Sequence, residues 1–548
     1  MERSPPVNAK SADISSTRQS RQSQNATKEP WTEQAASFVG FFIYLLILKS
    51  FFLPLFIIPT GSMAETLYGA HALHTCPNCG VEYALNWDQA KGAPAQVSCP
   101  NCRWVESRRI PRPRGAPAPA SKQILTKPLR QAAGDRIFVQ GWPYAWPLRE
   151  IDWLGPQRWD VVVFKVPNDG QTNYIKRLIG LPGETIEIID GNIFADGEIA
   201  QKTPQAQQSL WFPYYNHDYP PRESSPAPSK DGKPYWPRWI ARHDQVGWTD
   251  VDSRVPRFDG AELPRAEIQF VTRPGQRPAA GEINAVYGYN SGTKVAEEEL
   301  KVAVRDVRLS AEVEIEDGDG YVELSTTNHE DRFYARLYAD GLLTLEHDRT
   351  PGRSAGEREV WDKRVIPQNG PVKLALSSVD YAVSVAVNGE TVLRSTPEQW
   401  SITPEGARLR IDHEDHPELR CAAERIQVRL RHLLIERDVY YFDDRGSDRK
   451  PANAAKGRPL QLGPTEYFCC GDNSPNSSDG RYWREEMLGP HLQAAHQAGK
   501  YTVGTVPADQ MIGRAFFVYW PGFKPLLPGV SKRVPNLLPD LGRARWIR

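Results

Sequence analysis

Two short stretches of this sequence carry side chains that could act together in nucleophilic catalysis. Ser62 lies in the turn "IPTGSMAET", directly after a long apolar segment. A serine becomes a nucleophile when a neighbouring base accepts its proton, and in most hydrolases that base is histidine. The chain has 11 histidines, and none occupies a recognisable base context near an acidic motif. If Ser62 is a nucleophile, its base is therefore a residue of another type.

Lysine can be that base when burial lowers its pKa from about 10.4 towards neutrality. Lys176 lies in "NYIKRLIG", where Tyr174, Ile175, Leu178 and Ile179 surround it. Neighbours of this largely apolar kind are unusual for a surface lysine. An exposed lysine on an edge strand is the alternative interpretation.

A polar loop follows a predicted strand near the other end of the chain. It reads "CCGDNSPNSSDGRYW" over residues 469–483 and contains several Asp, Asn and Ser side chains. By composition alone it is a loop with turns stabilised by these side chains, and Ser62 alone is likewise a turn residue.

The order of these motifs resembles that of a known family. "PTGSMAETL", "GDRIFV", "RWDVVVFKVPN" with "NYIKRLIGLPGETI", and "GDNSPNSSDGRYW" with "VPADQMIGRAFF" follow one another behind an apolar segment. Together they resemble the conserved boxes of the bacterial type I signal peptidases, which are membrane-anchored Ser-Lys endopeptidases. The resemblance covers residues 36–75, 132–200 and 438–522, and it leaves 76–104 and 201–437 unexplained.

The resemblance implies a catalytic pair and a set of supporting residues. Ser62 is the expected nucleophile and Lys176 the expected unprotonated general base. The supporting residues are Thr60, Tyr174, Ser477, Asp479 and Arg481. The Ser62 N–H and the Thr60 hydroxyl would bind the oxyanion, and Tyr174 would lie beside the lysine. Ser477 would orient the lysine ammonium, while the last two residues hold their loop in place.

Three positions depart from the family's pattern. Thr60 stands where Ser is usual, which keeps the hydroxyl but adds a methyl group. Gly480 replaces the usual second Ser of "DSR", and Trp159 replaces a common Gly in "RGDVV". None of these changes removes a catalytic group.

The family's activity would make this chain an enzyme that removes signal peptides from exported preproteins. Cleavage would follow small residues at the first and third positions before the cut, with the substrate bound in extended form. Catalysis would need no cofactor. The expected partners are preproteins, the lipid bilayer and the secretion machinery. The expected location is the cytoplasmic membrane of a bacterium, with one membrane pass and the catalytic part on the extracytoplasmic side.

The apolar segment 36–58 is long enough to cross a bilayer, which takes about 17–25 residues. It ends in "IPTGSM" without an A-x-A cleavage pattern, so a retained anchor is favoured over a cleaved signal peptide. Its single charge is Lys49. Basic residues lie on both sides of the segment, so charge alone does not settle its orientation.

Four cysteines form a C-x2-C-x19-C-x2-C pattern at Cys76, Cys79, Cys99 and Cys102. This spacing is typical of a zinc ribbon, in which four thiolates leave no open position for catalysis. A zinc here would be structural. Disulfides are the alternative, because thiols oxidise outside the cytoplasm.

The remaining sequence predicts a second β-rich region. "VRLSAEVEIE" alternates apolar and polar residues, and "YADGLL" and "VNGETV" carry hairpin turns. This region resembles the concanavalin/laminin-G-like jelly rolls. The predicted fold is mainly β: a membrane-anchored, signal-peptidase-like β catalytic core with an inserted jelly-roll β-sandwich and a small zinc-ribbon-like module.

The predicted organisation has seven parts. They are a disordered tail (1–35), the anchor (36–58), the catalytic core (59–75, 105–200 and 438–525), the zinc-ribbon-like insert (76–104), a Pro/aromatic-rich connector (201–245), the β-sandwich (246–437) and a basic C-terminal tail (526–548). The formal net charge is zero, from 67 basic and 67 acidic residues, so nucleic acid is not an expected partner. The alternative function is a non-catalytic or narrowly specialised membrane protein whose sandwich and ribbon bind a partner or a glycan.

Overall fold

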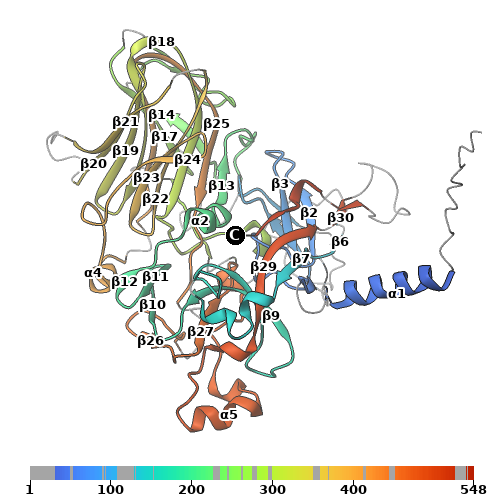
Figure 1. Ribbon diagram of the computed structural model, residues 1–548. Helices are drawn as coiled ribbons and strands as arrows, with labels where there is room; N and C mark the ends of the chain where they lie inside the picture. The colour runs from blue at the N-terminus through green and yellow to red at the C-terminus, as the bar shows by residue number, and fades with distance from the viewer. Residues whose placement is uncertain are drawn as a thin grey trace, which may run out of the picture. The chain divides into compact units, whose positions relative to one another are not determined.

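The fold is described from a computed structural model, and within the described residues it is mainly β, as the sequence predicts (Figure 1). The structure describes residues 31–47, 49, 53–88, 92, 94–107, 129, 131–151, 153–225, 235–242, 246–260, 263–273, 281–293, 296, 299–349, 358–367, 370–411, 415–443, 451–521, 523–524, 538–539 and 541–547. The chain divides into two compact units, Met1–Ser50 and Phe51–Arg548.

The first unit contains helix α1 (Trp31–Ile47). The helix begins inside the segment predicted to be disordered, because "TEQAA" consists largely of good helix formers. Within the described residues, no helix combines the length and apolar character that a membrane span needs. The anchor predicted over 36–58 also includes strand β1 (Leu55–Ile57), which belongs to the second unit.

An antiparallel sheet carries the candidate site. Its order is β1, β7 (Arg136–Gln140), β29 (Met511–Trp520), β8 (Val161–Lys165), β9 (Asn173–Gly180), β27 (Glu466–Cys470) and β28 (Val506–Pro507), and β32 (Arg545–Trp546) pairs with β29. The β-branched run "VVVFK" is almost wholly buried as β8, as expected for a central strand. This sheet brings together residues from both ends of the sequence.

A smaller antiparallel sheet follows directly in the chain. It contains β10 (Thr185–Ile189), β11 (Asn192–Ala195), β12 (Glu198–Ile199) and β26 (Leu460–Gln461). The turn residues Asp190 and Asp196 have positive φ, as does each following glycine. These are the turns that "DGN" and "ADGE" predict.

The largest sheet is built on two long neighbouring strands, β18 (Val307–Asn328) and β25 (Leu419–Arg437), which run side by side in Figure 1. The N-terminal half of β18 pairs with β22, and its C-terminal half pairs with β19. The other strands are β13 (Phe212–Asn216), β14 (Arg238–Ala241), β15 (Trp248–Thr249), β16 (Arg257–Gly260), β17 (Ala266–Val271), β19 (Asp331–Tyr338), β20 (Leu342–Asp348), β21 (Glu359–Val365), β22 (Val372–Val379), β23 (Ala382–Val387) and β24 (Glu390–Arg394). Side chains from both halves pack into one hydrophobic cluster. The jelly-roll description and the domain limits stay predictions.

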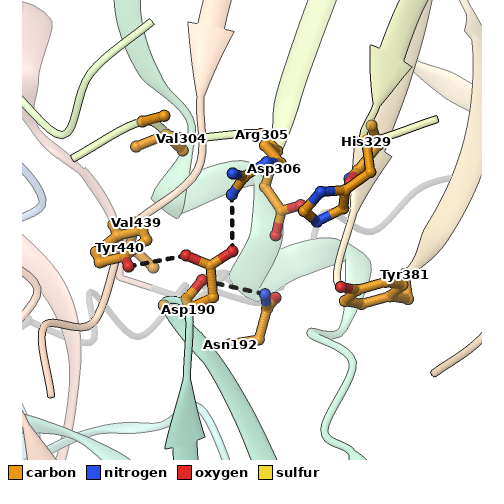
Figure 2. A pocket seen from close by; sticks show the side chains of 12 residues that line it. Asp190, Asn192, Val304, Arg305, Asp306, His329, Tyr381, Val439 and Tyr440 are labelled. Carbon is orange, nitrogen blue, oxygen red and sulfur yellow. Dashed lines mark hydrogen bonds and ion pairs between the residues drawn. The ribbon is translucent and has the colours of Figure 1, made fainter. Parts of the chain in front are cut away.

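The small and large sheets meet at a polar junction, which Figure 2 shows. Asp190, in the turn after β10, accepts hydrogen bonds from Arg305 at 2.8 Å and from Tyr440 at 3.0 Å. Asp306, His329 and the backbone of Gly191 line the same narrow pocket. These contacts link the turn after β10 to the segments that precede β18 and follow β25 of the large sheet.

The cysteine-containing module consists of two short hairpins. One pairs β2 (His71–Thr75) with β3 (Glu82–Asn86), and the other pairs β4 (Gln96–Ser98) with β5 (Val105–Ser107). Strand β6 (Gln131–Ala132) extends the first hairpin. Strands of these hairpins lie on both sides of the cysteine turns, at 71–75, 105–107 and 131–132 as well as within 76–104.

Two other predicted segments contain regular elements. The connector 201–245 contains helix α2 (Pro204–Leu210), β13 and β14, and its aromatic residues Phe212, Tyr214, Tyr215 and Trp239 are buried. Within the predicted C-terminal tail, residues 545–546 pair with β29. Helices α4 (Pro404–Leu409) and α5 (Pro490–Gln497) and the short hairpin of β30 (Phe523–Lys524) and β31 (Leu538–Pro539) complete the elements.

Candidate active site

Ser62 and Lys176, 114 residues apart in sequence, form a direct hydrogen bond. The distance from Lys176 Nζ to Ser62 Oγ is 2.7 Å. Ser62 lies in the turn that follows β1, and Lys176 lies in the middle of β9. Ser62 is 9% exposed and Lys176 is 3% exposed. Both residues of the pair are therefore buried.

The position of Lys176 within β9 explains its burial. Val162 is its partner across β8, and Tyr174 and Leu178 share its face of β9 because side chains alternate along a strand. The ammonium lies 5.1 Å from the centre of the Tyr174 ring and also donates to the Ile175 carbonyl oxygen at 2.9 Å. Burial lowers the pKa of Lys176 to about 8, against the opposing pull of Asp479. At pH 7 about a tenth of such lysines would be uncharged and able to accept a proton.

The two carboxylates nearest this lysine each bind an arginine instead. Arg481 binds Asp479 through two nitrogens, at 2.9 and 2.7 Å, and Arg177 binds Asp472 likewise, at 2.8 and 2.7 Å. All four side chains are fully buried. Although burial works against it, the Arg481 guanidinium lowers the pKa of Asp479. The arginines neutralise these acids, so the acids do little to hold a proton on Lys176.

The loop that contains Asp479 also fixes the serine turn. The Asn473 backbone N–H donates to the Ser62 carbonyl at 3.0 Å, and its side-chain amide donates to the Gly61 carbonyl at 2.9 Å. Within the part of the chain that the structure describes, no hydrogen bond occupies the Ser62 N–H. Thr60 is exposed two residues earlier. The oxyanion role of the Ser62 N–H and the Thr60 hydroxyl stays a prediction.

Ser477 is fully buried in the same loop. Its hydroxyl forms a hydrogen bond that helps lower the pKa of Asp479. Ser477 Oγ lies so close to Gly471 that a Cβ there would come within 2.2 Å of it and within 2.5 Å of the Ser62 carbonyl oxygen. The structure therefore brings Ser477 beside the serine turn, and its orienting role stays a prediction.

Two departures from the family's pattern now have physical explanations. A Cβ at Gly480 would lie 2.4 Å from the Gly504 carbonyl oxygen, so no side chain fits there. Trp159 adopts φ 76°, a left-handed conformation that costs roughly 1–2 kcal/mol for a residue with a Cβ. Its buried indole packs into a hydrophobic cluster, and its carbonyl accepts from Arg177 at 2.8 Å. Burial of the large ring offsets the backbone strain.

The fold and site define a β protein that holds a serine hydroxyl against a buried lysine of lowered pKa. The family described as "Signal peptidase, peptidase S26" matches this chain over residues 130–227 and 401–520. The Rickettsia typhi signal peptidase I is 50% identical over 48 residues, which are 9% of this chain and 18% of that protein. The Pseudomonas fluorescens signal peptidase I is 42% identical over 76 residues, 13% of this chain and 27% of that protein. The predicted resemblance to signal peptidase I is confirmed, and the matched stretches span well under two thirds of these relatives.

Two solved structures similar to this chain are a carbohydrate-binding module and a laminarinase catalytic domain. The carbohydrate-binding module CBM66 from Bacillus subtilis has 10% identity and a TM-score of 0.22, with 36% of this chain and 94% of that chain covered. The laminarinase catalytic domain from Thermotoga petrophila has 10% identity and a TM-score of 0.23, with 42% and 98% covered. At these TM-scores, neither likeness carries an argument about fold or ligand.

The four predicted metal ligands form one cluster. Their sulfur atoms all lie within 4.8 Å of one another, and the Cys76–Cys102 and Cys79–Cys99 separations are both 3.6 Å. A tetrahedral zinc with bonds of about 2.3 Å sets neighbouring sulfurs about 3.8 Å apart, whereas a disulfide needs about 2.0 Å. The donor set and its spacing fit a structural zinc.

A further group of acids surrounds a second buried lysine. Asp306, Asp380 and Asp438 present carboxylate oxygens within 4.8 Å of one another. Lys202 Nζ binds Asp380 at 2.6 Å and Asp438 at 2.8 Å. Its ammonium supplies the positive charge that this cluster needs.

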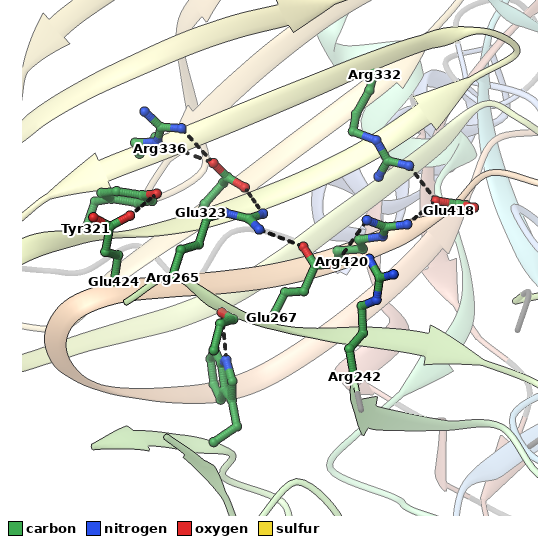
Figure 3. A network of polar contacts seen from close by, with 12 residues as sticks. Arg242, Arg265, Glu267, Tyr321, Glu323, Arg332, Arg336, Glu418, Arg420 and Glu424 are labelled. Atoms are coloured by element: carbon green, nitrogen blue, oxygen red, sulfur yellow. Dashed lines mark hydrogen bonds and ion pairs between the residues drawn. The ribbon is translucent and has the colours of Figure 1, made fainter. Parts of the chain in front are cut away.

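Charged side chains also cover part of the large sheet, as Figure 3 shows. Arg265 binds Glu323 at 2.8 Å and Glu267 at 2.9 Å, and Arg336 binds Glu323 at 2.9 Å. Arg420 binds Glu267 at 3.0 Å. These charges neutralise one another, so the surface offers paired ions rather than a field of one sign.

Sequence reasoning missed the partners that hold the site in place. Arg177 directly follows the catalytic lysine candidate, and the pairing of Arg177 with Asp472 has no local signal because 295 residues separate the two. The segment Tyr287–Asn290, which lies in the region predicted as a sandwich insert, also contacts the serine turn and its loop. No motif in the sequence marks it.

Proposed function

We propose that the chain is a serine endopeptidase of the signal peptidase type, with Ser62 as nucleophile and Lys176 as general base. The observation that carries the proposal is the 2.7 Å hydrogen bond between Lys176 Nζ and Ser62 Oγ, combined with the pKa of about 8 that burial gives the lysine. Signal peptidase relatives support a signal-peptide substrate.

Neutral Lys176 accepts the Ser62 proton while Oγ attacks the carbonyl carbon of the scissile bond. The resulting oxyanion accepts hydrogen bonds from the Ser62 N–H and the Thr60 hydroxyl, each worth about 3 kcal/mol in the barrier. The Lys176 ammonium then returns its proton to the leaving amine, which leaves an ester on Ser62. Lys176 next takes a proton from water, and the resulting attack on the ester releases the signal peptide and restores both side chains.

The substrate is an extended preprotein segment with small residues at the first and third positions before the cut. Strand β1 is an edge of its sheet within the described residues and ends five residues before Ser62. Such an edge can take an added strand from an extended peptide. Catalysis needs no cofactor in this scheme.

The catalytic part works at the surface of a bacterial cytoplasmic membrane, on its extracytoplasmic side, with the apolar residues of segment 36–58 that precede β1 as the anchor. Four apolar side chains support a bilayer contact, since Leu55, Ile57, Trp146 and Trp153 are exposed. Tryptophan is enriched at the boundary between lipid and water. Preproteins, lipid and the secretion machinery are the partners.

The four-cysteine cluster holds a structural zinc in this proposal. Both cysteine turns have the same backbone pattern, with the N–H four residues after the first cysteine donating to that cysteine's carbonyl at 2.9 Å. Native mass spectrometry should find one zinc per chain, and Cys99→Ser should lose it. The control is Cys421→Ser, a buried cysteine far from the cluster in sequence, which should retain the metal. A metal-free wild type would contradict the assignment.

Cleavage of a preprotein with an A-x-A site tests the catalytic proposal. The detergent-solubilised wild type should cut after the second alanine, and Ser62→Ala and Lys176→Ala should lose about 10²–10⁴-fold in kcat/KM. The matched control is Lys165→Ala, which removes a lysine from neighbouring strand β8 whose ammonium binds the Gln171 carbonyl. It should cleave within about threefold of the wild type.

Two results would count against the proposal. If the folded wild type cuts no A-x-A preprotein, signal peptidase activity fails, and the alternative of a specialised binding protein gains support. If Lys176→Ala cleaves as well as Lys165→Ala, another residue is the base.

A further inference from the structure

Part of the large β-rich insert lies against the serine turn itself. Tyr289 covers Gly61 so closely that a Cβ on the glycine would lie 2.0 Å from the tyrosine ring. Tyr289 also donates from its hydroxyl to the Ala70 carbonyl at 3.0 Å and stacks on Tyr68. Two positions earlier, Tyr287 donates to the Asp472 carbonyl at 2.8 Å. The insert thus contacts both elements that form the candidate active site.

Asn290 makes the most specific of these contacts. Its amide nitrogen donates to Asn473 Oδ1 at 2.6 Å and to Glu299 Oε1 at 2.5 Å. Its amide oxygen accepts from Asn473 Nδ2 at 2.9 Å and from Asn476 Nδ2 at 3.2 Å. All four hydrogen-bonding positions of this fully buried amide are therefore used.

Asn473 transmits this constraint to the nucleophile. Its side-chain amide, which is paired with Asn290, also donates to the Gly61 carbonyl, and its backbone N–H donates to the Ser62 carbonyl. The Gly61 carbonyl and the Ser62 N–H belong to one planar peptide unit, in which they point in opposite directions. Fixing the carbonyl therefore fixes the direction of the N–H that would bind the oxyanion.

We infer that Asn290, a residue of the insert, is a positioning residue for the Ser62 turn and acts through Asn473. The inference rests on the proposed function for its catalytic consequence. It gives the insert a part in catalysis: without Asn290, the Asn473 side-chain amide keeps only its hydrogen bond to the Gly61 carbonyl, so the peptide unit before Ser62 is held less firmly. Misplacement of a catalytic group by about 1 Å can cost about a hundredfold in rate.

Asn290→Ala tests the inference, and Asn284→Ala is its matched control. Asn284 is a buried asparagine of the same insert, but its amide binds Tyr214 and the Leu300 carbonyl and not the catalytic loop. Asn290→Ala should lower kcat about tenfold to hundredfold with KM within about twofold. Asn284→Ala should leave kcat within about twofold of the wild type, even if its melting temperature falls as much as that of Asn290→Ala.

A double-variant cycle tests whether Asn290 acts through Asn473. The combined Asn290→Ala and Asn473→Ala variant should be no slower than Asn473→Ala alone, because both remove the same constraint. The inference would be overturned if the kcat losses of the two single variants multiplied in the double variant. An equal loss of kcat in Asn290→Ala and Asn284→Ala would overturn it as well.

Hydrogen exchange separates this inference from the proposed function. Backbone amides in residues 61–67 of Asn290→Ala should exchange faster than in the wild type, while those of Asn284→Ala should not. If the wild type cleaves no preprotein but Asn290→Ala still exchanges faster than the wild type, the structural link between Asn290 and the serine turn stands. Only the catalytic function is then rejected. Unchanged exchange together with unchanged kcat would reject the positioning role.

Discussion

Lys176 and Lys202 are both buried, and the structure gives them opposite protonation behaviour. Burial lowers the pKa of Lys176 to about 8. For Lys202, burial acts in the same direction, but Asp380 and Asp438 outweigh it and raise the pKa above its ordinary value. The comparison shows that burial alone does not make a lysine a base.

The difference lies in what the nearby carboxylates bind. Asp380 and Asp438 contact Lys202 directly, at 2.6 and 2.8 Å. Near Lys176, Asp472 and Asp479 are engaged by Arg177 and Arg481, and the lysine contacts a neutral hydroxyl instead. A carboxylate that already binds a guanidinium stabilises an ammonium much less. The two arginines therefore support the effect of burial, which is the main cause of the lowered Lys176 pKa.

Replacing each lysine by methionine should affect activity very differently. Lys176→Met removes the base and should lower kcat/KM about 10²–10⁴-fold. Lys202→Met should retain kcat/KM per folded molecule within about threefold. Peptide cleavage assays corrected for the folded fraction measure this, and equal losses would break the contrast between the two sites.

For the free energy of unfolding, the larger change should come from Lys202→Met rather than from Lys176→Met. Lys202→Met leaves the Asp306, Asp380 and Asp438 carboxylates without their cation, which should lower the free energy of unfolding by about 3–5 kcal/mol. Because the folded pKa of Lys202 is raised, this contribution is fully present below the unfolded pKa of about 10.5 and is lost only as pH rises through the folded value. Denaturant unfolding at pH 7 measures it. An unchanged midpoint would show that the acids take up protons without cost.

Lys176→Met should stabilise the protein at neutral pH. A pKa of about 8 in the folded state against 10.5 unfolded corresponds to a penalty of about 3 kcal/mol. The penalty is fully present below pH 8 and disappears as pH rises through 10.5, since the unfolded lysine then loses its proton as well. Unfolding free energies of variant and wild type, compared at pH 7 and near pH 10.5, should therefore converge. A destabilised variant at pH 7 would mean that the Ser62 contact outweighs the buried charge.

The pH dependence of the wild type tests the Lys176 pKa directly. Below pH 8, kcat/KM should fall about tenfold per pH unit, because only neutral Lys176 accepts the Ser62 proton. A profile of kcat/KM from pH 5 to pH 9 with a stable peptide substrate measures it. A flat profile across pH 8 would place the lysine pKa elsewhere.

Much of the core could be predicted from local sequence. The strands around "VVVFK", "NYIKRLIG" and "EYFCC" appear as β8, β9 and β27, since β-branched and aromatic runs favour buried strands. The four cysteines lie together as their spacing predicts. The ends of segments were harder. Residues 31–35 are helical because of their good helix formers, whereas residues 545–546 pair with β29, a distant contact that composition does not reveal.

The sequence by itself determined which side chains are available: a serine after an apolar segment, a lysine among apolar neighbours, a polar loop and four cysteines with metal-ligand spacing. Only the tertiary structure decided which acids are neutralised by arginines, and which amide of the distant insert holds the serine turn. Those decisions depend on contacts between residues hundreds of positions apart, such as Arg177 with Asp472 and Asn290 with Asn473. Protonation and orientation follow from burial and from close polar partners, and both exist only once the chain has folded.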